Sequence, residues 1–439
     1  MKTLLRDSSY VMVTNVAQLI ISLGSGALIA RALGPEGKGQ LFLILQIASM
    51  GGLLLSLGLG PSYQYHLGKE RFSRAALISH CFFQIGLIAV ILWAAYSFGL
   101  EGLRVITGQS LSNGLIAATL GLVVLNVATL TFGCLLMGMP DGVRRGSLYS
   151  VIGGGVYIGA LGTILVGLKW GIVGALCATA AGWIVRTLFV MRPVMDGAWI
   201  DLAWPDAKMS RVLLGYGMGS LMGNLMLTSV LRIDTFILNI YGGAAAVGIY
   251  SVAVSTGELL LLIPGAIGVA FFPYLTALKP EDQVDAMCFV ARANLILGLI
   301  GSVALAALGY PFLLVVFGGR FTSAFVPLLW LLPGLIAMTV NYSYANFFSS
   351  RGEPMLNASI FGIGAVLNIG INLMLIPRFG ITGAAIASSV AYSAISFGFI
   401  FLIGKRTGAS FHELAVPKIS DIGQIARKLG ALVLEKVDA

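Results

Sequence analysis

The amino-acid sequence predicts an all-α polytopic membrane protein, with about twelve transmembrane helices in two six-helix lobes. Three observations predict this fold class: few charges, long apolar runs, and a residue pattern that occurs twice. Hydrophobic residues make up 58% of the 439 residues and charged residues only 10%, whereas a soluble domain has about 25% charged residues. A chain with so few charges cannot cover a surface that faces water.

The apolar runs are long enough to cross a membrane. A helix needs roughly 20 apolar residues to span the hydrocarbon core, and the runs 41–59, 75–99 and 115–138 have about that length or more. Short connections with Gly, Pro and charged residues separate such runs. We expect these spans in chain order: 10–32, 40–66, 75–99, 112–139, 146–167, 171–191, 212–240, 246–276, 287–309, 324–348, 355–376 and 381–404.

Two stretches 209 positions apart share one order of residues. "LKWGIVGALCATA" begins at Leu168 and "PRFGITGAAIASS" begins at Pro377. Gly39 and Gly248 show the same interval after spans one and seven. Six spans separate the copies, so both enter the membrane in the same direction. This predicts a parallel internal repeat, as in many transporters, with these parts: an N-terminal lobe 1–195, a cytoplasmic inter-lobe linker 196–211, a C-terminal lobe 212–404 and a cytoplasmic tail 405–439.

The basic residues predict that both termini are cytoplasmic. With the N-terminus inside, the cytoplasmic segments and the tail hold eighteen Lys and Arg residues and the opposite side holds six, which agrees with the positive-inside rule. The net charge of +9 therefore describes the inner membrane face and does not indicate nucleic-acid binding. The four Cys lie in or beside apolar runs and the three His are scattered, so we expect no metal site and no cofactor.

Charged residues inside the spans are the candidate site, because a charge in hydrocarbon is costly and usually faces a cavity or a partner. The arginine fork matches phosphate oxygens, so several arginines in a dry cavity would suit a diphosphate. The substrate candidates are Arg232, Arg292, Arg31, Arg186 and Asn372. Asn372 shares one face of span eleven with Asn368, four positions earlier, so this pair could line the cavity or form a hydrogen bond between helices. The candidates for coupling or ion pairing are Asp234 and Glu258.

The same residues also have a structural alternative. Arg292 could form an inter-helix salt bridge with Glu258, and Arg31 and Arg186 could extend to the membrane interface. Arg232 and Asp234 are two positions apart, so on a helix they do not face each other and each needs its own partner.

Helix breakers predict positions at which helices bend. Span one contains "GSG", with Gly24 and Gly26, and span eight contains Pro264. Such residues permit kinks in membrane helices. We expect these three positions to act as hinges between two access states.

Polar aromatic stretches leave two interpretations open. "PSYQYH" ends span two and "NYSYANFF" ends span ten. Tyrosine rings could stack on sugars, or the stretches could form the aromatic belt at a membrane interface. Their place near the predicted cytoplasmic face favours the belt.

Three long stretches carry a resemblance to a known family: "RALGPEGKGQLF", "RIDTFILNIYGGAAAVGIYSVAVSTGELLLLIPGAIGVAFFPYLT" and "SSRGEPMLNASIFGIGAVLNIGINLMLIPRFGITGAAIASSVAY". They resemble the O-antigen type oligosaccharide flippases of the polysaccharide transporter family. That family belongs to the multidrug/oligosaccharidyl-lipid/polysaccharide (MOP) superfamily, together with lipid II flippases and multidrug and toxin extruders (MATE). The resemblance covers nearly the whole chain.

The resemblance implies a function and a location. A polyprenyl-diphosphate-linked oligosaccharide would cross the bacterial cytoplasmic (inner) membrane by alternating access through a basic central cavity, for surface polysaccharide biosynthesis. The partners would be this lipid-linked substrate and the bilayer, with the polymerase and glycosyltransferases of the same pathway as candidates. One alternative is a MATE-like secondary exporter of drugs or small solutes. A second is a membrane enzyme, which the short external connections disfavour, because they offer no nucleophile–base pair or carboxylate pair.

Overall fold

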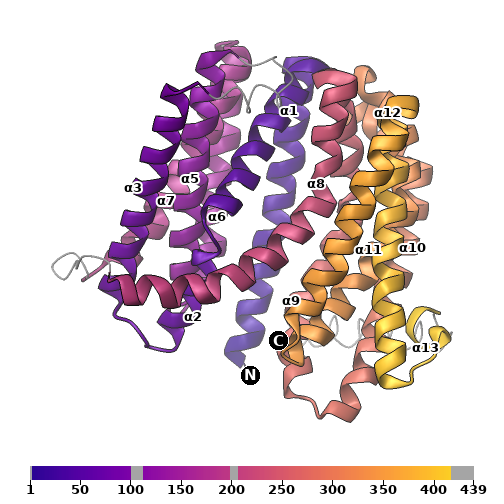
Figure 1. Cartoon of the computed structure of the whole chain (residues 1–439). Helices are drawn as coiled ribbons and strands as arrows, with labels where there is room; N and C mark the ends of the chain where they lie inside the picture. Colours follow the sequence, from indigo (N-terminus) through magenta and orange to yellow (C-terminus); the bar gives the residue numbers. More distant parts are fainter. Residues whose placement is uncertain (1, 100–111, 198–205, 417–439) are drawn as a thin grey trace. The chain divides into compact units, whose positions relative to one another are not determined.

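The computed structural model of the chain describes residues 2–99, 112–197 and 206–416, and every regular element in these ranges is helical (Figure 1). Ten helices there are long and apolar enough to cross a membrane. The elements are α1 (Lys2–Leu55), α2 (Leu59–Gly68), α3 (Arg74–Ser97), α5 (Asn113–Met137), α6 (Gly142–Ala160), η1 (Leu161–Gly167), α7 (Gly171–Met195), α8 (Ala207–Gly257), α9 (Leu259–Ala277), α10 (Pro280–Val316), η2 (Gly319–Ala324), α11 (Phe325–Ser350), α12 (Pro354–Thr407) and α13 (Phe411–Ala415).

Three of the long elements, α1, α8 and α12, are each interrupted by one glycine. Gly34, Gly243 and Gly380 have φ values of 67°, 71° and 54°, a left-handed conformation that glycine adopts without steric cost. Divided at these glycines, and with the end of α8 continued by α9, the ten apolar helices correspond to the twelve predicted spans. The predicted fold class is therefore confirmed.

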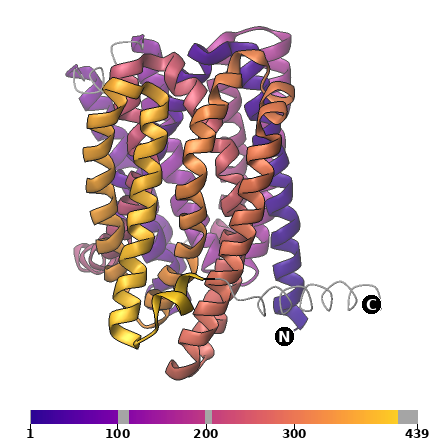
Figure 2. The same ribbon diagram turned by 90° about the vertical axis from the view of Figure 1, so that its right-hand side faces the viewer.

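The element α12 shows how such a glycine makes a helical hairpin. Nδ2 of Asn368 donates to Oγ of Ser388 across the two halves. Nearer the open end, a Cβ on Gly364 would lie 2.3 Å from the side chain of Ile395. The two halves therefore pack antiparallel, and Figure 2 shows α12 in orange to yellow.

The backbone also follows the repeat interval found in the sequence. Gly34 and Gly243, 209 positions apart, are both hairpin glycines, and Gly171 and Gly380, also 209 apart, both have positive φ. Equivalent positions of the two copies thus adopt the same unusual conformation. The repeat is a property of the backbone as well as of the residue order.

Two equivalent glycines of the repeat lie against each other. A Cβ on Gly39 would be 1.7 Å from the carbonyl oxygen of Ala244, and a Cβ on Gly248 would be 1.9 Å from the carbonyl oxygen of Pro35. Pro35 and Ala244 are again 209 positions apart. The contact is therefore symmetric, with backbone touching backbone, and only glycine fits at either position.

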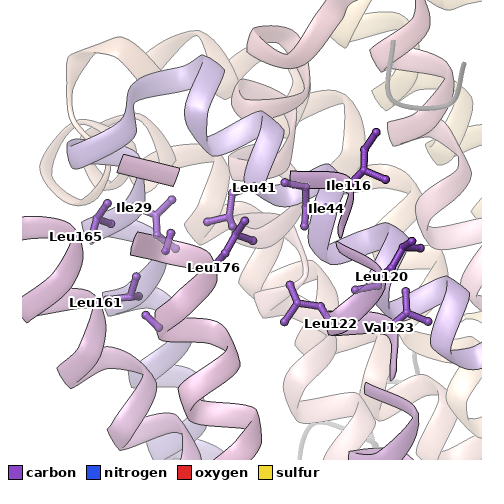
Figure 3. Close-up of a cluster of buried hydrophobic side chains, with 13 residues drawn as sticks. Ile29, Leu41, Ile44, Ile116, Leu120, Leu122, Val123, Leu161, Leu165 and Leu176 are labelled. Carbon is purple, nitrogen blue, oxygen red and sulfur yellow. The ribbon is translucent and has the colours of Figure 1, made fainter. Parts of the chain in front are cut away.

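One of two hydrophobic core clusters of the first compact unit lies where α1, α5, η1 and α7 meet (Figure 3). The hydroxyls of Thr129 and Thr187 join α5 to α7 at 2.7 Å. Small and branched side chains allow close packing of membrane helices, where dispersion rather than burial from water drives association. The buried members are Ile29, Leu41, Ile44, Ala48, Ile116, Leu120, Leu122, Val123, Leu161, Leu165, Ala175, Leu176 and Ala178.

In the second unit, α11 packs between α9 and the hairpin α12. The closest approach is at Gly334 of α11, where a Cβ would lie 2.3 Å from Cα of Ser389. Oγ of Ser389 accepts from the amide of Gly334 at 3.0 Å and donates to the carbonyl of Trp330 at 2.5 Å. A small residue on each helix and one shared hydroxyl hold this pair together.

Contacts group the chain differently from the predicted lobes 1–195 and 212–404. The first unit comprises Met1–Thr228, Thr235–Ser251 and Leu314–Phe321, and the second comprises the other residues. Residues Thr235–Ser251 of the second repeat copy belong to the first unit because Gly248 packs against the backbone around Gly39. Residues 198–205 of the predicted linker and 417–439 of the predicted tail lie outside the described residues.

Candidate functional site

An ion pair lies within the second unit, on residues of predicted spans. Arg232 belongs to α8, and Glu258 stands between α8 and α9. Nη1 of Arg232 is 2.8 Å from Oε1 of Glu258, and Nη2 donates to Oε2 at 3.2 Å. The pair is bidentate, and its side chains are only 23% and 28% exposed. Two parallel hydrogen bonds fix the direction of the guanidinium as well as its position.

Glu258 occupies a break in the helical chain. The amide of Leu261 donates to its carbonyl at 2.9 Å, which forms a tight turn between the two helices. Pro264 follows, and because proline lacks an N–H and its ring crowds the carbonyl four residues earlier, a helix is weakened just before it. The helix is therefore irregular at Glu258, whose own backbone stays helical (φ −62°, ψ −14°), and α9 continues through the predicted hinge at Pro264.

Asp234 belongs to a second, fully buried set of polar groups. Oγ of Ser388 donates to Oδ2 of Asp234 at 2.8 Å, and Nδ2 of Asn368 donates to Oγ of Ser388 at 3.4 Å. Nδ2 of Asn372 donates in turn to Oδ1 of Asn368 at 2.5 Å. These four side chains are at most 1% exposed. A buried carboxylate is costly unless it is hydrogen-bonded, so this chain of donors supports Asp234.

Tyr392 joins the two sets. It is 4% exposed and lies close to the charged side chains of Asp234, Glu258 and Arg232 and to Ser388. Arg232 and Asp234 thus have different direct partners, as their spacing predicts. We call the full set the Arg232 cluster; it contains Arg232, Asp234, Glu258, Asn368, Asn372, Ser388 and Tyr392.

The Arg232 cluster includes two residues that sequence reasoning missed, Ser388 and Tyr392. Both lie in the second copy of the repeat, in "ASSVAY", four positions apart and therefore on one helix face. This spacing of polar groups in a small-residue helix was the available signal. The stretch "RFGITGAAIASS" was interpreted only as a surface of small residues for helix packing. That interpretation gave no reason to assign a hydrogen-bond partner to these hydroxyls.

The Arg232 cluster contains both hydrogen-bond donors and hydrogen-bond acceptors. Arg232 is partly exposed and presents a fork suited to carboxylate or phosphate oxygens. Oδ1 of Asn372 is buried without a hydrogen-bond partner, and such atoms are rare in native structures. The cluster combines a cation, two acids and an unused acceptor within one unit.

Arg292 has a different position, on the backbone of the short helix α13. Its Nη1 donates to the carbonyl of Glu413 at 2.8 Å, and the hydroxyl of Tyr344 donates to the carbonyl of Leu414 at the same distance. Leu414 is fully buried. The structure therefore pairs Glu258 with Arg232 and uses Arg292 to hold α13 in place.

Arg31 and Arg186 belong to the first unit. Nε of Arg31 donates to the carbonyl of Val316 at 3.1 Å, and its Nη2 donates to the carbonyl of Val315. These carbonyls end α10, where they have no intrahelical partner. Arg186 of α7 packs on α6, where a Cβ on Gly153 would lie 2.8 Å from its Cβ, and its Nε has no hydrogen-bond partner.

The predicted hinges Gly24 and Gly26 lie within a continuous helical part of α1. A Cβ on Gly24 would be 3.1 Å from the side chain of Ile158, so this glycine serves the packing of α1 on α6. The reversal of α1 comes later, at Gly34.

The polar aromatic stretches have neighbours of their own. The hydroxyl of Tyr63 lies 2.8 Å from Nδ1 of His80 and donates to Gln84 at 3.0 Å, in a fully buried position. Tyr65 is 43% exposed and stacks on Tyr216 with ring centroids 4.5 Å apart. Within the described residues, no group of three or more His, Cys, Asp or Glu side chains could hold a metal ion.

The sequence is similar to one described family and to archaeal membrane proteins. Residues 4–279 match the family described as polysaccharide biosynthesis protein. The probable flippase AglR of Haloferax volcanii is 24% identical over 390 residues, which cover 83% of this chain and 74% of AglR. An uncharacterized membrane protein of Methanocaldococcus jannaschii, MJ1068, is 30% identical over 190 residues, 42% of this chain and 38% of that relative. The chain thus matches well under half of MJ1068.

Solved structures confirm the fold. A MATE family transporter of the MOP superfamily in its inward-facing conformation has a TM-score of 0.73 at 17% identity, over 92% of this chain and all of that one. The lipid II flippase MurJ, inward closed, has a TM-score of 0.72 at 14% identity, over 97% and 92%. Because the family match spans more than half of the sequence, the chain belongs to the polysaccharide biosynthesis protein family, as a multi-pass membrane protein with the MOP fold.

Proposed function

We propose that this protein is a flippase, which moves a polyprenyl-diphosphate-linked oligosaccharide across the cytoplasmic membrane for surface polysaccharide or glycan assembly. The family match and the relatives named as flippases support this class of cargo. Both termini lie in the cytoplasm in this proposal, and pathway enzymes such as a polymerase and glycosyltransferases are candidate partners. The relatives reported above are archaeal, and a bacterial source remains a prediction.

The observation that carries the proposal is the bidentate Arg232–Glu258 pair at a partly exposed position in the membrane-spanning part of the chain. The guanidinium fork binds a carboxylate and a phosphate with the same geometry. A diphosphate can therefore replace Glu258 as the partner of Arg232. Glu258 keeps the cation paired when no substrate is present, because an unpaired charge inside a membrane is costly.

The remaining groups of the Arg232 cluster suit the same cargo. The diphosphate brings negative charge beside Asp234 and Glu258, so like-charge repulsion opposes a static complex. Transport requires binding that is strong enough to load the substrate and weak enough to release it. In this proposal the two acids lower the affinity of the arginine for the diphosphate, and alternating access then carries the head group across.

A MATE-like secondary exporter is the second candidate. The fold likeness to a MATE transporter and the two membrane-embedded acids, Asp234 and Glu258, favour it. A cationic drug would pair with these acids, whereas a diphosphate would pair with Arg232. The two candidates therefore predict opposite effects of charge on the cargo.

The test uses purified protein in liposomes that contain a polyprenyl-diphosphate oligosaccharide. A soluble glycosidase cleaves the sugars that reach the outer leaflet. We expect wild type to expose them, and Arg232→Ala to lose at least about 90% of the rate, since a charged hydrogen-bond partner contributes about 1.5–3 kcal/mol. Arg406→Ala is the matched control, because Arg406 forms an exposed ion pair with Glu353 and should transport normally.

Two outcomes would count against the proposal. Absence of transport by wild type, together with export of a cationic dye, would favour the exporter. Transport by Arg232→Ala at the rate of Arg406→Ala, with equal protein in the liposomes, would remove the phosphate role of Arg232. In cells, surface polysaccharide should disappear in the Arg232→Ala strain while the protein still inserts.

A further inference from the structure

The first unit has an apolar groove between α5 and α7, and none of its lining residues belongs to the Arg232 cluster. Its volume is about 690 Å³, within the range of small-molecule sites. Leu122 and Leu176, which belong to the buried cluster of Figure 3, are part of its wall. The other lining residues are Ser112, Gly114, Leu115, Ala118, Gly121, Val124, Leu125, Ala128, Val173, Cys177, Ala180 and Ile184.

The groove follows one face of each helix. On α5 the lining positions 114, 118, 121, 125 and 128 recur every three or four residues, and on α7 the positions 173, 177, 180 and 184 do the same. Most of these positions on α5 are Gly or Ala. A Cβ on Gly121 would meet nothing within 4 Å. The small residues therefore leave indentations that no other part of the described chain fills.

The groove is long for a lipid chain. Its lining runs from Ser112 to Ala128 along α5, about 24 Å at 1.5 Å per residue. The hydrocarbon core is about 30 Å thick, so the hydrocarbon of one leaflet is about 15 Å thick and shorter than the groove. The acyl chains of a phospholipid end near the midplane, whereas the groove continues beyond one leaflet.

Charge is arranged to suit an amphipathic anion. The lining contains no charged side chain. Lys169 and Trp170 are exposed just before α7, at the same end as Ser112. Tryptophan marks membrane interfaces, and the lysine provides a cation there. An occupant with an anionic head and a single long hydrocarbon tail matches this arrangement.

We propose that the groove between α5 and α7 binds the isoprenoid tail of the lipid-linked substrate, with the diphosphate end toward Lys169 when the head group is not on Arg232. This inference rests on the proposed function, which it deepens. The turns of α5 are about 5.4 Å apart, a spacing similar to that of the methyl branches on an extended isoprenoid. Each branch can enter an indentation at a small residue.

The groove has a mechanical use in transport. Leaving lipid for the groove exchanges one apolar surrounding for another, so the tail gains packing contacts and little hydrophobic free energy. Binding is then weak and reversible. A tail that passes the midplane stays in hydrocarbon while its head group changes leaflet, and the groove keeps it beside the protein during that change.

The experiment fills the groove. Gly121→Phe places a ring in the open space, and Gly133→Phe is the matched control, since Gly133 lies on α5 outside the lining and a Cβ there also meets nothing within 4 Å. The probe is an isoprenoid diphosphate that carries a benzophenone at its tail. Cross-linked peptides are mapped by mass spectrometry, with excess unlabelled polyprenyl diphosphate or phosphatidylglycerol as competitor.

We expect cross-links on α5 and α7 peptides, which polyprenyl diphosphate suppresses and equal phosphatidylglycerol does not. Gly121→Phe should lower labelling about tenfold or more, a typical effect of a shape change in an apolar pocket, and Gly133→Phe should label like wild type. Ala180→Phe fills the groove from the α7 wall and should lower the labelling to the same extent. It takes the place of Gly121→Phe in the test if Gly121→Phe does not fold. Equal competition by phosphatidylglycerol, or unchanged labelling of folded Gly121→Phe and Ala180→Phe, would overturn the inference.

The two proposals fail separately. Labelling of the groove by the isoprenoid probe without oligosaccharide transport by wild type would support the groove and contradict the proposed function. Transport by wild type with cross-links only outside α5 and α7 would support the function and overturn the groove.

Discussion

The symmetric glycine contact between the two copies makes a strong prediction for Gly248→Ala. The new Cβ would lie 1.9 Å from the Pro35 carbonyl oxygen and 3.0 Å from the amide nitrogen of Gly39. Real Cβ atoms essentially never approach closer than 3.0 Å. Both clashing groups are backbone, so no side-chain rotation can relieve them, and the two helices must separate by about 1 Å.

The expected cost follows from two opposing effects. Overpacking a tight contact costs about 1–3 kcal/mol, and a clash between backbones belongs near the upper end. Alanine is favoured over glycine in a helix by about 1 kcal/mol. We therefore expect Gly248→Ala to lower the free energy of unfolding by about 1–2 kcal/mol.

The assay is thermal unfolding of purified protein in detergent, with Gly219→Ala as control. Gly219 lies on the same helix, α8, and a Cβ there would meet nothing within 4 Å, so this variant should melt at the wild-type temperature or above it. The double variant Gly39→Ala/Gly248→Ala should cost less than the two single costs together, because one separation relieves both clashes. Equal melting of Gly248→Ala and Gly219→Ala would refute the reasoning.

Two further predictions concern single hydrogen bonds. Tyr344→Phe should destabilise the protein by about 1 kcal/mol and speed proteolysis at α13, since it removes a hydrogen bond to that backbone; an unchanged cleavage rate would contradict this. Ser388→Ala should cost about 1–3 kcal/mol by removing a donor to buried Asp234, and a melting temperature equal to wild type would show that this bond is dispensable.

Much of the fold was predictable from the chain because hydropathy is a local property. A run of about 20 apolar residues has few alternatives to a membrane helix, and the twelve runs correspond to the observed helices and their hairpins. The interval of 209 positions was equally visible, and Gly34 and Gly243 repeat it in their backbone conformation. The different directions of Arg232 and Asp234 followed from helix geometry alone.

The partners of polar side chains were less predictable. Arg232 finds Glu258 26 positions away, and Asp234 finds Ser388 154 positions away. Arg292, expected at the cavity or in a salt bridge with Glu258, donates to the backbone of α13, 121 positions away. No local window contains such pairs, and two acids inside the spans, Asp234 and Glu258, were available to each arginine.

The sequence by itself determined the membrane class, the number of spans, the repeat and the set of charges that lie inside the spans. These depend on transfer from water to hydrocarbon, which acts on each segment separately. Tertiary structure decided which charges meet, where Gly39 and Gly248 touch, and that α5 and α7 leave a groove at Gly121. Those features depend on which helix faces pack together, and packing is decided by the shapes of distant segments jointly.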